Sequence, residues 1–319
     1  MNIYNLDLLV KTLEFISVSN FEKQNINLAI GNFDGVHLGH QEIIKNLINK
    51  SKNINAKSAI LSFTPHPREF FTGNNDDFKI IEEEIKINLL KQFKVDYYIS
   101  YIFDKPLSLL DPEEFIEKIL YNQLGIKSIT VGYDFKFGKN RKGDTNLLKK
   151  LSDKYNYSVF VIEQIKDKKN NLIYSSSLIR DNIKSGNFES VTLLLGRNWT
   201  MKGPVIRGDG RARKINFPTA NILPKNLIKP KKGVYAIKAI FNNKSYFGIA
   251  NFGIRPTIKG DNLLLEAHLF DFNEEIYGKE LTVEFLKFIR GEKKFNNFSL
   301  LVEQIQKDIK LVKDYHRKI

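Results

Sequence analysis

The spacing of apolar residues changes near Trp199, and this change constrains the fold more than any other feature of the chain. Before Trp199, strand-like apolar runs alternate with amphipathic helical segments. After it, short apolar runs follow one another with only turn residues between them. Alternation predicts a parallel sheet with helices on both faces, whereas closely spaced short strands predict a small antiparallel barrel or sandwich. The 319 residues are enough for two such domains, and we place them at 1–186 and 187–319.

The expected elements follow the apolar pattern along the chain. In the first half, the expected strands are Asn27–Ile30, Ser58–Phe63, Tyr97–Ile102, Ser128–Val131 and Ser158–Ile162. Helices are expected over 41–49, 80–93 and 112–124, and two short ones joined at Gly186 over 181–197. The helix over 112–124 has Asp111 as its expected N-cap and Pro112 in its first turn. The second half is expected to hold strands at Gly233–Phe241, Ser245–Phe252, Leu263–Phe272 and Leu281–Ile289, then a helix over 298–316.

The segment 28–40 points to a phosphate site. Its apolar run stops at Gly31 and leads through a glycine-bearing turn into the helix expected over 41–49. The backbone N–H groups and the dipole at such a helix N-terminus attract phosphate. His37 and His40 stand where this helix starts, three residues apart, so both can face one ligand. A lone histidine would more simply cap the helix or pack locally, but the ordered set of glycines and histidines favours a ligand.

Three further segments follow expected strands, at the sheet edge where open α/β folds bind ligands. They are Thr64–Pro67, Gly132–Gly138 with Arg141 and Gly143 beyond it, and Tyr174–Arg180. Serine hydroxyls, backbone N–H groups and the Arg180 guanidinium at one helix start suit an oxyanion. Two simpler readings stay open: the serines could only cap the helix, and Phe135 and Phe137 could belong to the core.

The residue types in these segments favour nucleotidyl transfer. The sequence has no Walker A motif, which excludes a P-loop enzyme. Two histidines and a serine–arginine helix start, without a covalent nucleophile, can hold an α-phosphate for in-line attack. They can also stabilise the charge on the reacting phosphorus and on the departing pyrophosphate.

The second half carries a different set of polar residues. The glycines of 203–210 and the neighbouring arginines Arg207, Arg211 and Arg213 predict a flexible cationic loop that covers phosphates. Thr219 and Asn221 offer two neutral oxygen ligands that fit a hard cation such as Mg²⁺. Glu266 lies in an apolar strand, where a carboxylate is either exposed on a polar face or placed to abstract a proton. Spacing alone leaves both readings open.

Four segments of the first half together resemble the adenylyltransferase module of bacterial bifunctional riboflavin kinase/FMN adenylyltransferases: GNFDGVHLGH, TPHP, GYDFKFG with its following arginine, and SSSLIR. The resemblance implies an FMN adenylyltransferase domain over 1–186 with a Rossmann-like nucleotidyltransferase fold. It implies catalytic roles for His37 and His40, and ATP contacts from Gly31, Phe33, His37, Gly39, His40, Ser176, Ser177 and Arg180. The implied flavin contacts are Asn32, Asp34, His66, Asp134, Phe135 and Arg141. Ser177 replaces the family's usual threonine and keeps its hydroxyl.

Segments of the second half resemble the kinase module of the same family: FPTAN at 217–221, GVYA at 233–236, the turn at 251–257, and Glu266. This implies a riboflavin kinase domain over 187–319, built as a small antiparallel barrel with a C-terminal helix. The implied ATP contacts are Gly203, Gly208, Gly210, Arg213, Pro218, Thr219 and Asn221, with Thr219 and Asn221 also on Mg²⁺. The implied flavin contacts are Asn251, Arg255 and Glu266, with Glu266 as catalytic base. Ala212 and Asn216 replace glycines usual in the family, which bears on the kinase rate.

Composition separates the remaining alternatives. A net charge of +14 would suit a nucleic-acid binder, but the lysines are scattered and no zinc-finger or RNA-binding signature accompanies them. The sequence has no cysteine, no signal-peptide pattern and no apolar run of roughly 20 residues. We therefore expect a cytoplasmic enzyme, monomeric or weakly self-associating, that uses ATP, riboflavin, FMN, FAD and Mg²⁺ without nucleic acid or membrane. The alternative is an adenylyltransferase whose barrel mainly binds flavin.

Overall fold

The computed structural model describes residues 14–17, 22, 24–73, 78–166, 172–207, 217–224, 226–257 and 260–318. The chain divides into two compact units. One lies within Met1–Asn75 and Glu82–Ser175, and the other within Asp76–Ile81 and Ser176–Ile319. Across the described ranges, no helix has both the length and the apolar character needed to cross a membrane. The two expected domains, divided after residue 186, remain a prediction beside these contact-defined units.

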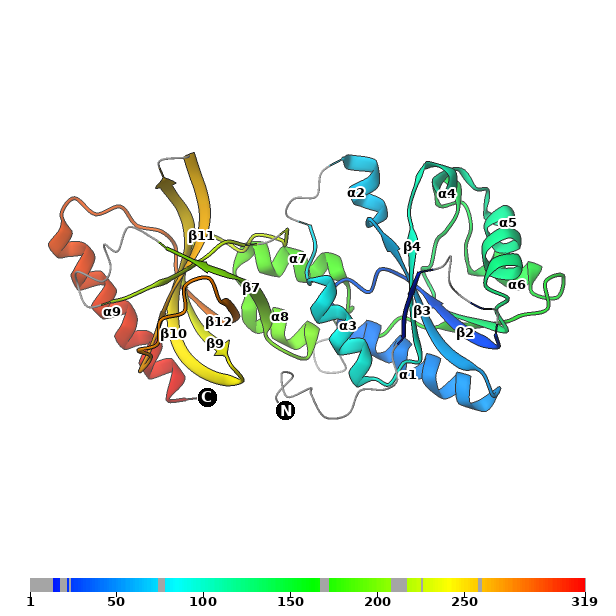
Figure 1. Ribbon diagram of the computed structural model, residues 1–319, viewed down its shortest axis with the longest axis horizontal. Coiled ribbons are helices and arrows are strands. Elements are labelled where there is room, and N and C mark those ends of the chain that lie inside the picture. The colour runs from blue at the N-terminus through cyan, green and yellow to red at the C-terminus, as the bar shows by residue number, and fades with distance from the viewer. Residues whose placement is uncertain are drawn as a thin grey trace. The chain divides into compact units, whose positions relative to one another are not determined.

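The first unit contains a parallel sheet, as the alternating pattern predicts. Its six strands follow the order β1-β4-β3-β2-β5-β6, and each neighbouring pair is parallel (Figure 1). The strands are β1 (Glu14–Ser17), β2 (Ile26–Ile30), β3 (Lys57–Thr64), β4 (Tyr97–Ile102), β5 (Ser128–Gly132) and β6 (Ser158–Ile162). Five of them were expected from the sequence. β1 was not, because its four residues are too short to show a periodic pattern.

Helices connect the strands of this unit. They are α1 (Leu38–Asn53), α2 (Pro67–Thr72), α3 (Glu83–Gln92), α4 (Lys105–Leu109), α5 (Pro112–Glu114), the π-helical η2 (Phe115–Gln123), the 3₁₀-helical η3 (Lys139–Arg141) and α6 (Thr145–Leu151). The start predicted at Pro112 is confirmed: the backbone N–H of Asp111 donates to Glu114 Oε2 at 3.0 Å. The start predicted at Ile80 is wrong, since α3 begins at Glu83. Ile80 is buried in the other unit, where its carbonyl accepts the indole N–H of Trp199.

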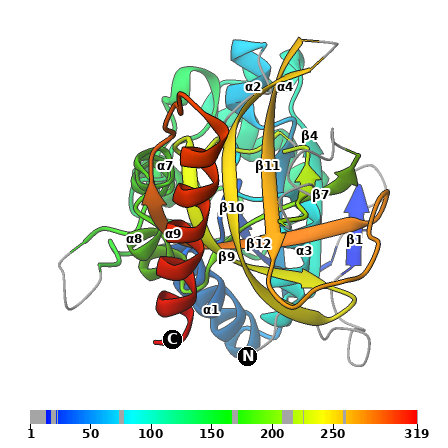
Figure 2. The same ribbon diagram turned by 90° about the vertical axis from the view of Figure 1, so that its left-hand side faces the viewer.

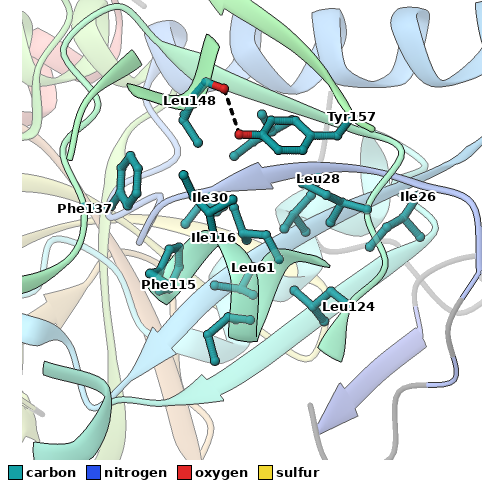
Figure 3. Packing of buried hydrophobic residues seen from close by; sticks show 14 of the residues in the cluster. Ile26, Leu28, Ile30, Leu61, Phe115, Ile116, Leu124, Phe137, Leu148 and Tyr157 are labelled. Carbon is teal, nitrogen blue, oxygen red and sulfur yellow. Dashed lines mark hydrogen bonds between the residues drawn. The ribbon is translucent and has the colours of Figure 1, made fainter. Parts of the chain in front are cut away.

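The core of the first unit lies on both faces of the sheet, so β2 is buried along its whole length. On one face, Asn27 donates to the carbonyl of Leu47 in α1. On the other, Ile26, Leu28 and Ile30 join an apolar cluster that includes residues of η2 (Figure 3). Tyr157 belongs to this cluster, and its hydroxyl donates to the carbonyl of Leu148 at 2.7 Å. Strand β2 is thereby held firmly, and so is the turn that follows it.

Within the described residues, the second unit is a closed antiparallel barrel with three helices. The barrel order is β10-β11-β8-β7-β12-β9, with β9 also paired to β10. Its strands are β7 (Trp199–Ile206), β8 (Ala220–Ile222), β9 (Gly233–Phe241), β10 (Lys244–Thr257), β11 (Gly260–Leu269) and β12 (Glu280–Arg290), and its helices are α7 (Ser176–Ser185), α8 (Phe188–Leu195) and α9 (Phe298–His316). The predicted barrel is confirmed, as are the bounds of β9 and α9. Asn242 and Asn243 both adopt positive φ, 48° and 61°, which suits the tight turn between β9 and β10.

Helix α9 packs against the outer face of the barrel, beside β10 (Figure 2). Val312 of α9 joins a buried cluster with Val234, Ala236, Ile249 and Leu286 from β9, β10 and β12. An ion pair with a buried carboxylate also joins α9 to the end of β12. The Arg290 guanidinium at the end of β12 donates from Nε and Nη2 to Asp308 Oδ2, at 2.9 and 2.7 Å.

Candidate active sites

The turn after β2 has an unusual backbone. Gly35 has a φ of 90°, and the two non-glycine residues Phe33 and Val36 also have positive φ, at 48° and 42°. The N–H of Val36 donates to the carbonyl of Phe33 at 3.0 Å and closes the turn. Left-handed non-glycine residues cost free energy and are concentrated at functional sites. The segment that the sequence marks as a phosphate site therefore carries backbone strain.

His37 and His40 are brought together at the start of α1. Nδ1 of His37 accepts a hydrogen bond from the N–H of His40 at 3.2 Å, so His37 is the N-cap of the helix. The two rings stack with centroids 3.6 Å apart and planes 16° from parallel. Because Nδ1 of the buried His37 accepts, the neutral ring carries its proton on Nε2. Capping thus fixes the tautomer that can donate to an oxyanion.

Gly39 allows this pair to form. A Cβ at Gly39 would lie 3.0 Å from the Cβ of Tyr174 and 3.1 Å from two ring atoms of His37. Both distances are shorter than ordinary packing allows. A side chain at Gly39 would therefore displace either the Tyr174 backbone or the His37 ring.

A buried lysine, which no motif in the sequence marks, lies beneath the same turn. Lys86 of α3 donates from Nζ to the carbonyl of Asn32 and to Ser62 Oγ, each at 3.3 Å. It also pairs with Glu83 at 2.8 Å. The Tyr98 hydroxyl donates to the same carboxylate, and burial raises the pKa of this hydroxyl. In the sequence, Lys86 precedes the apolar Leu89 and Leu90 by three and four residues. This spacing places all three on one face of a helix and indicates that Lys86 faces the core.

The loops after β3 and β5 hold the expected flavin-side residues. His66 caps α2: its Nδ1 accepts from the N–H of Arg68 at 3.1 Å, and its own N–H donates to Glu69. After β5, the N–H of Phe135 donates to the carbonyl of Gly132 at 3.1 Å, which makes a turn around Asp134. Strands β3, β2 and β5 are parallel neighbours, so the His37, His66 and Asp134 loops leave the same edge of the sheet.

Phe135 and Phe137, which could belong either to the core or to a ligand site, differ in burial. Phe137 is a core residue, and the backbones of Phe137 and Gly143 exchange two hydrogen bonds that close the loop. Phe135 is partly buried and stacks on Phe137 with centroids 5.5 Å apart. Arg141 is exposed, with a positive φ of 57°.

The serine–arginine helix start is confirmed as a helix, since α7 begins at Ser176. This helix belongs to the second unit. Nε of Arg180 donates to the carbonyl of Phe78 at 2.9 Å, and its guanidinium stacks over the Phe78 ring at 3.9 Å. Phosphate binding by Ser176, Ser177 and Arg180 remains a prediction.

In the barrel, Asn221, Glu266 and Asn251 form one row across three neighbouring strands. Glu266 of β11 is directly opposite Asn251 of β10 on one side and Asn221 of β8 on the other. Directly opposite residues of an antiparallel pair project to the same face of the sheet. This is the face that α9 covers, because Ile249, two residues before Asn251, packs with Val312. Residues separated by long stretches of sequence thus converge on one carboxylate.

A cavity of about 340 Å³ opens on the second unit beside α9. It is lined by Phe217, Gln306, Ile309, Lys310, Lys313, Asp314 and Arg317. Phe217 is the first residue of the FPTAN segment, and its ring meets His268 edge to face at 5.6 Å. His268 lies two residues after Glu266 on β11, so the cavity is close to the polar row.

The donors expected for Mg²⁺ are the neutral oxygens of Thr219 and Asn221. Among the residues described, no group of three histidine, cysteine or acidic side chains could hold a metal ion. Mg²⁺ commonly takes only one or two protein ligands and completes its shell with substrate phosphates and water. The buried Asn221, two residues after Thr219, fits this mode.

The expected cationic loop is only partly described. Gly208, Gly210, Arg211, Arg213, Ala212 and Asn216 lie outside the described residues, as does the side chain of Arg255. Gly203 lies inside β7, so the prediction that it belongs to a flexible loop is wrong. A Cβ at this position would lie 2.6 Å from the carbonyl oxygen of Leu223. Glycine is therefore required because the two backbone segments approach each other closely here.

Comparison with known proteins gives matches along almost the whole chain. Residues 19–177 match the FAD synthetase family, and residues 195–316 match the riboflavin kinase family. Bifunctional riboflavin kinase/FMN adenylyltransferases from Buchnera aphidicola subsp. Schizaphis graminum and from Haemophilus influenzae are each 39% identical. These matches cover 95% and 92% of this chain, and 98% and 94% of those proteins.

A crystal structure described as a macrolide-efflux protein from Streptococcus pneumoniae superposes with a TM-score of 0.83 at 26% identity, over 94% of this chain and 98% of that one. The two family matches occur in the order FAD synthetase, then riboflavin kinase, and the two relatives carry both activities in their name. The chain therefore belongs to the family of bifunctional riboflavin kinase/FMN adenylyltransferases.

Proposed function

We propose that this chain converts riboflavin and ATP to FMN and ADP in its barrel, and FMN and ATP to FAD and pyrophosphate in its α/β domain. The observation that supports the proposal is that each unit contains a cluster of polar groups that could serve phosphate chemistry. The stacked His37–His40 pair belongs to one unit, and the Asn221–Glu266–Asn251 row to the other. Location in the cytoplasm, and a monomeric or weakly self-associating state, are parts of the same proposal.

In the kinase reaction, Glu266 takes the proton of the riboflavin 5′-hydroxyl as that oxygen attacks the γ-phosphate of ATP. Asn251 lies opposite Glu266 and would orient the flavin. Thr219 and Asn221 would hold Mg²⁺ together with ATP. The bound Mg²⁺ supplies positive charge that offsets the charge developing on the phosphates. This assignment selects the proton-abstraction reading of Glu266 over that of a solvated carboxylate.

In the adenylyl transfer, a phosphate oxygen of FMN attacks the α-phosphate of ATP and pyrophosphate leaves. The His37 Nε2–H and the His40 ring donate to the phosphate oxygens where negative charge develops. The strained turn and the N-terminus of α1 hold ATP in line for attack. Asn32, Asp34, His66, Asp134, Phe135 and Arg141 would hold FMN on the other side of the reacting phosphorus.

One incubation tests both reactions. The purified chain is mixed with riboflavin, ATP and Mg²⁺, and the flavins are separated by chromatography over time. FMN should appear first and FAD should follow. FAD formed only from supplied FMN would reduce the barrel to a flavin-binding module. An absence of flavin turnover with salt-sensitive binding of RNA would instead support the nucleic-acid alternative.

A further inference from the structure

Of the FPTAN segment, 217–221, only Ala220 and Asn221 belong to a strand among the described residues. Strand β8 is only three residues long, Ala220–Ile222. Its pairing with β11 ends at Ala220 opposite Ala267, so Thr219 lies just beyond the ladder. Pro218 has no N–H and cannot extend the ladder as a donor. Some other contact must hold Thr219 in place relative to β11.

His268 provides such a contact. Its Nδ1 lies 2.8 Å from the carbonyl oxygen of Pro218. A carbonyl can only accept, so Nδ1–H is the donor, and this fixes the tautomer of the neutral ring. The same ring meets Phe217 edge to face at 5.6 Å and Phe270 at 5.8 Å. One imidazole therefore holds both residues that precede Thr219.

His268 and Glu266 are two residues apart on β11 and so project to the same face of the strand. The hydrogen bond from His268 thus ties the segment that carries Thr219 to the strand that carries the expected base. We propose that His268 is a positioning residue of the kinase: through Pro218 it sets the distance between the Thr219 hydroxyl and Glu266. This inference rests on the proposed function of the barrel.

Three substitutions separate the functions of the ring. His268→Asn places an amide N–H where Nδ1 was and can restore the bond to Pro218. His268→Gln carries its amide one bond further out, near the place of Nε2, and misaligns that bond. His268→Phe keeps the aromatic contacts with Phe217 and Phe270 but has no donor. All three are made in the full chain.

The assay measures kcat and KM for riboflavin phosphorylation, with adenylylation of supplied FMN as the internal control. A misplacement of about 1 Å can cost about 100-fold in rate. We expect kcat to fall by about 10-fold to 100-fold in His268→Phe and His268→Gln, with KM for riboflavin unchanged. His268→Asn should stay within about threefold of the parent. Adenylylation should be unchanged in all three.

Two results would overturn the assignment. Full turnover in His268→Phe with loss in His268→Asn would show that the aromatic surface matters and the hydrogen bond does not. Parental kcat in all three variants would remove any role in positioning. A parent that does not phosphorylate riboflavin would instead overturn the proposed function of the barrel, and this inference with it.

Discussion

His37 and His40 are paired at the start of α1: the N–H of His40 donates to Nδ1 of His37, and the two rings stack 3.6 Å apart. His37 is therefore a helix-capping histidine, and the cap is compatible with the phosphate contact proposed for its Nε2–H. The cap determines which ring nitrogen carries the proton. The stack determines where the second ring stands.

Removing the His40 ring should stop FAD synthesis while FMN still accumulates from riboflavin. In His40→Ala the backbone N–H that caps onto His37 remains, so the loss is confined to the side chain. Loss of one group that stabilises developing charge typically costs about 10² to 10³ in rate. Chromatography of the flavins measures both reactions in one sample. Loss of both activities in a folded variant would contradict two independent sites.

Glu266→Gln should slow riboflavin phosphorylation by roughly 10² to 10⁴, the usual contribution of a general base. Adenylylation of supplied FMN should not change. Glu274→Gln is the matched control, because Glu274 is an exposed carboxylate of the same unit. If the Glu266 variant phosphorylates riboflavin at the parental rate, the carboxylate is a solvated surface group.

Lys86→Met should lower adenylylation by about 10-fold, the effect of losing one hydrogen bond that positions the turn. Asn32 and Ser62 both lose their donor from Nζ, while the methionine fills most of the same volume. Phosphorylation of riboflavin should stay at its parental rate. The control is Lys52→Met, at an exposed position in the last turn of α1. Equal rates in both variants would mean that the buried ammonium does not position the turn.

Asp308→Ala should destabilise the second unit by about 3 kcal/mol, the lower end of the loss for a buried pair, because it leaves the partly buried guanidinium of Arg290 without its carboxylate. Glu303→Ala breaks the exposed Glu303–Lys307 pair on the same helix and should have no measurable effect. Trp199 is the only tryptophan of the chain and is buried in this unit, so its fluorescence in urea reports the unfolding. Similar losses in the two variants would contradict this account.

His316 should make the second unit less stable in acid. Burial lowers the pKa of the His316 ring in the folded state below its usual value of about 6.5. As the pH is lowered, the unfolded chain therefore binds the proton before the folded chain does. The free energy of unfolding keeps its full value above about pH 6.5 and decreases as the pH falls below it. His316→Gln should reduce the loss of urea stability between about pH 7.5 and about pH 5.5. An identical pH dependence in parent and variant would exclude His316 as the cause.

The long periodic elements were predictable because their own residues determine them. β9 and α9 have the predicted bounds, since apolar alternation and a continuous amphipathic face mark their ends. Contacts made far along the chain were not predictable. The burial of Ile80 against the Trp199 indole, and the strand neighbour that makes Gly203 necessary, appear only in the fold.

The same difference applies to the sites. The histidine turn is local and was found as a motif. The row through Glu266 depends on the register of three strands, which no local pattern specifies. The sequence could nominate these residues one by one: Asn221 and Glu266 from their residue type and setting, and Asn251 through resemblance. It could not place them opposite one another.

Closure of the barrel has a consequence for aggregation. A ring of paired strands has no free edge to which another chain can add a strand. The sheet of the first unit is open, and within the described residues β6 (Ser158–Ile162) pairs on one side only, with β5. Its sequence, SVFVI, combines high β-propensity with no charge. When the chain is heated or overproduced, association between molecules should therefore start at β6 and leave the barrel intact.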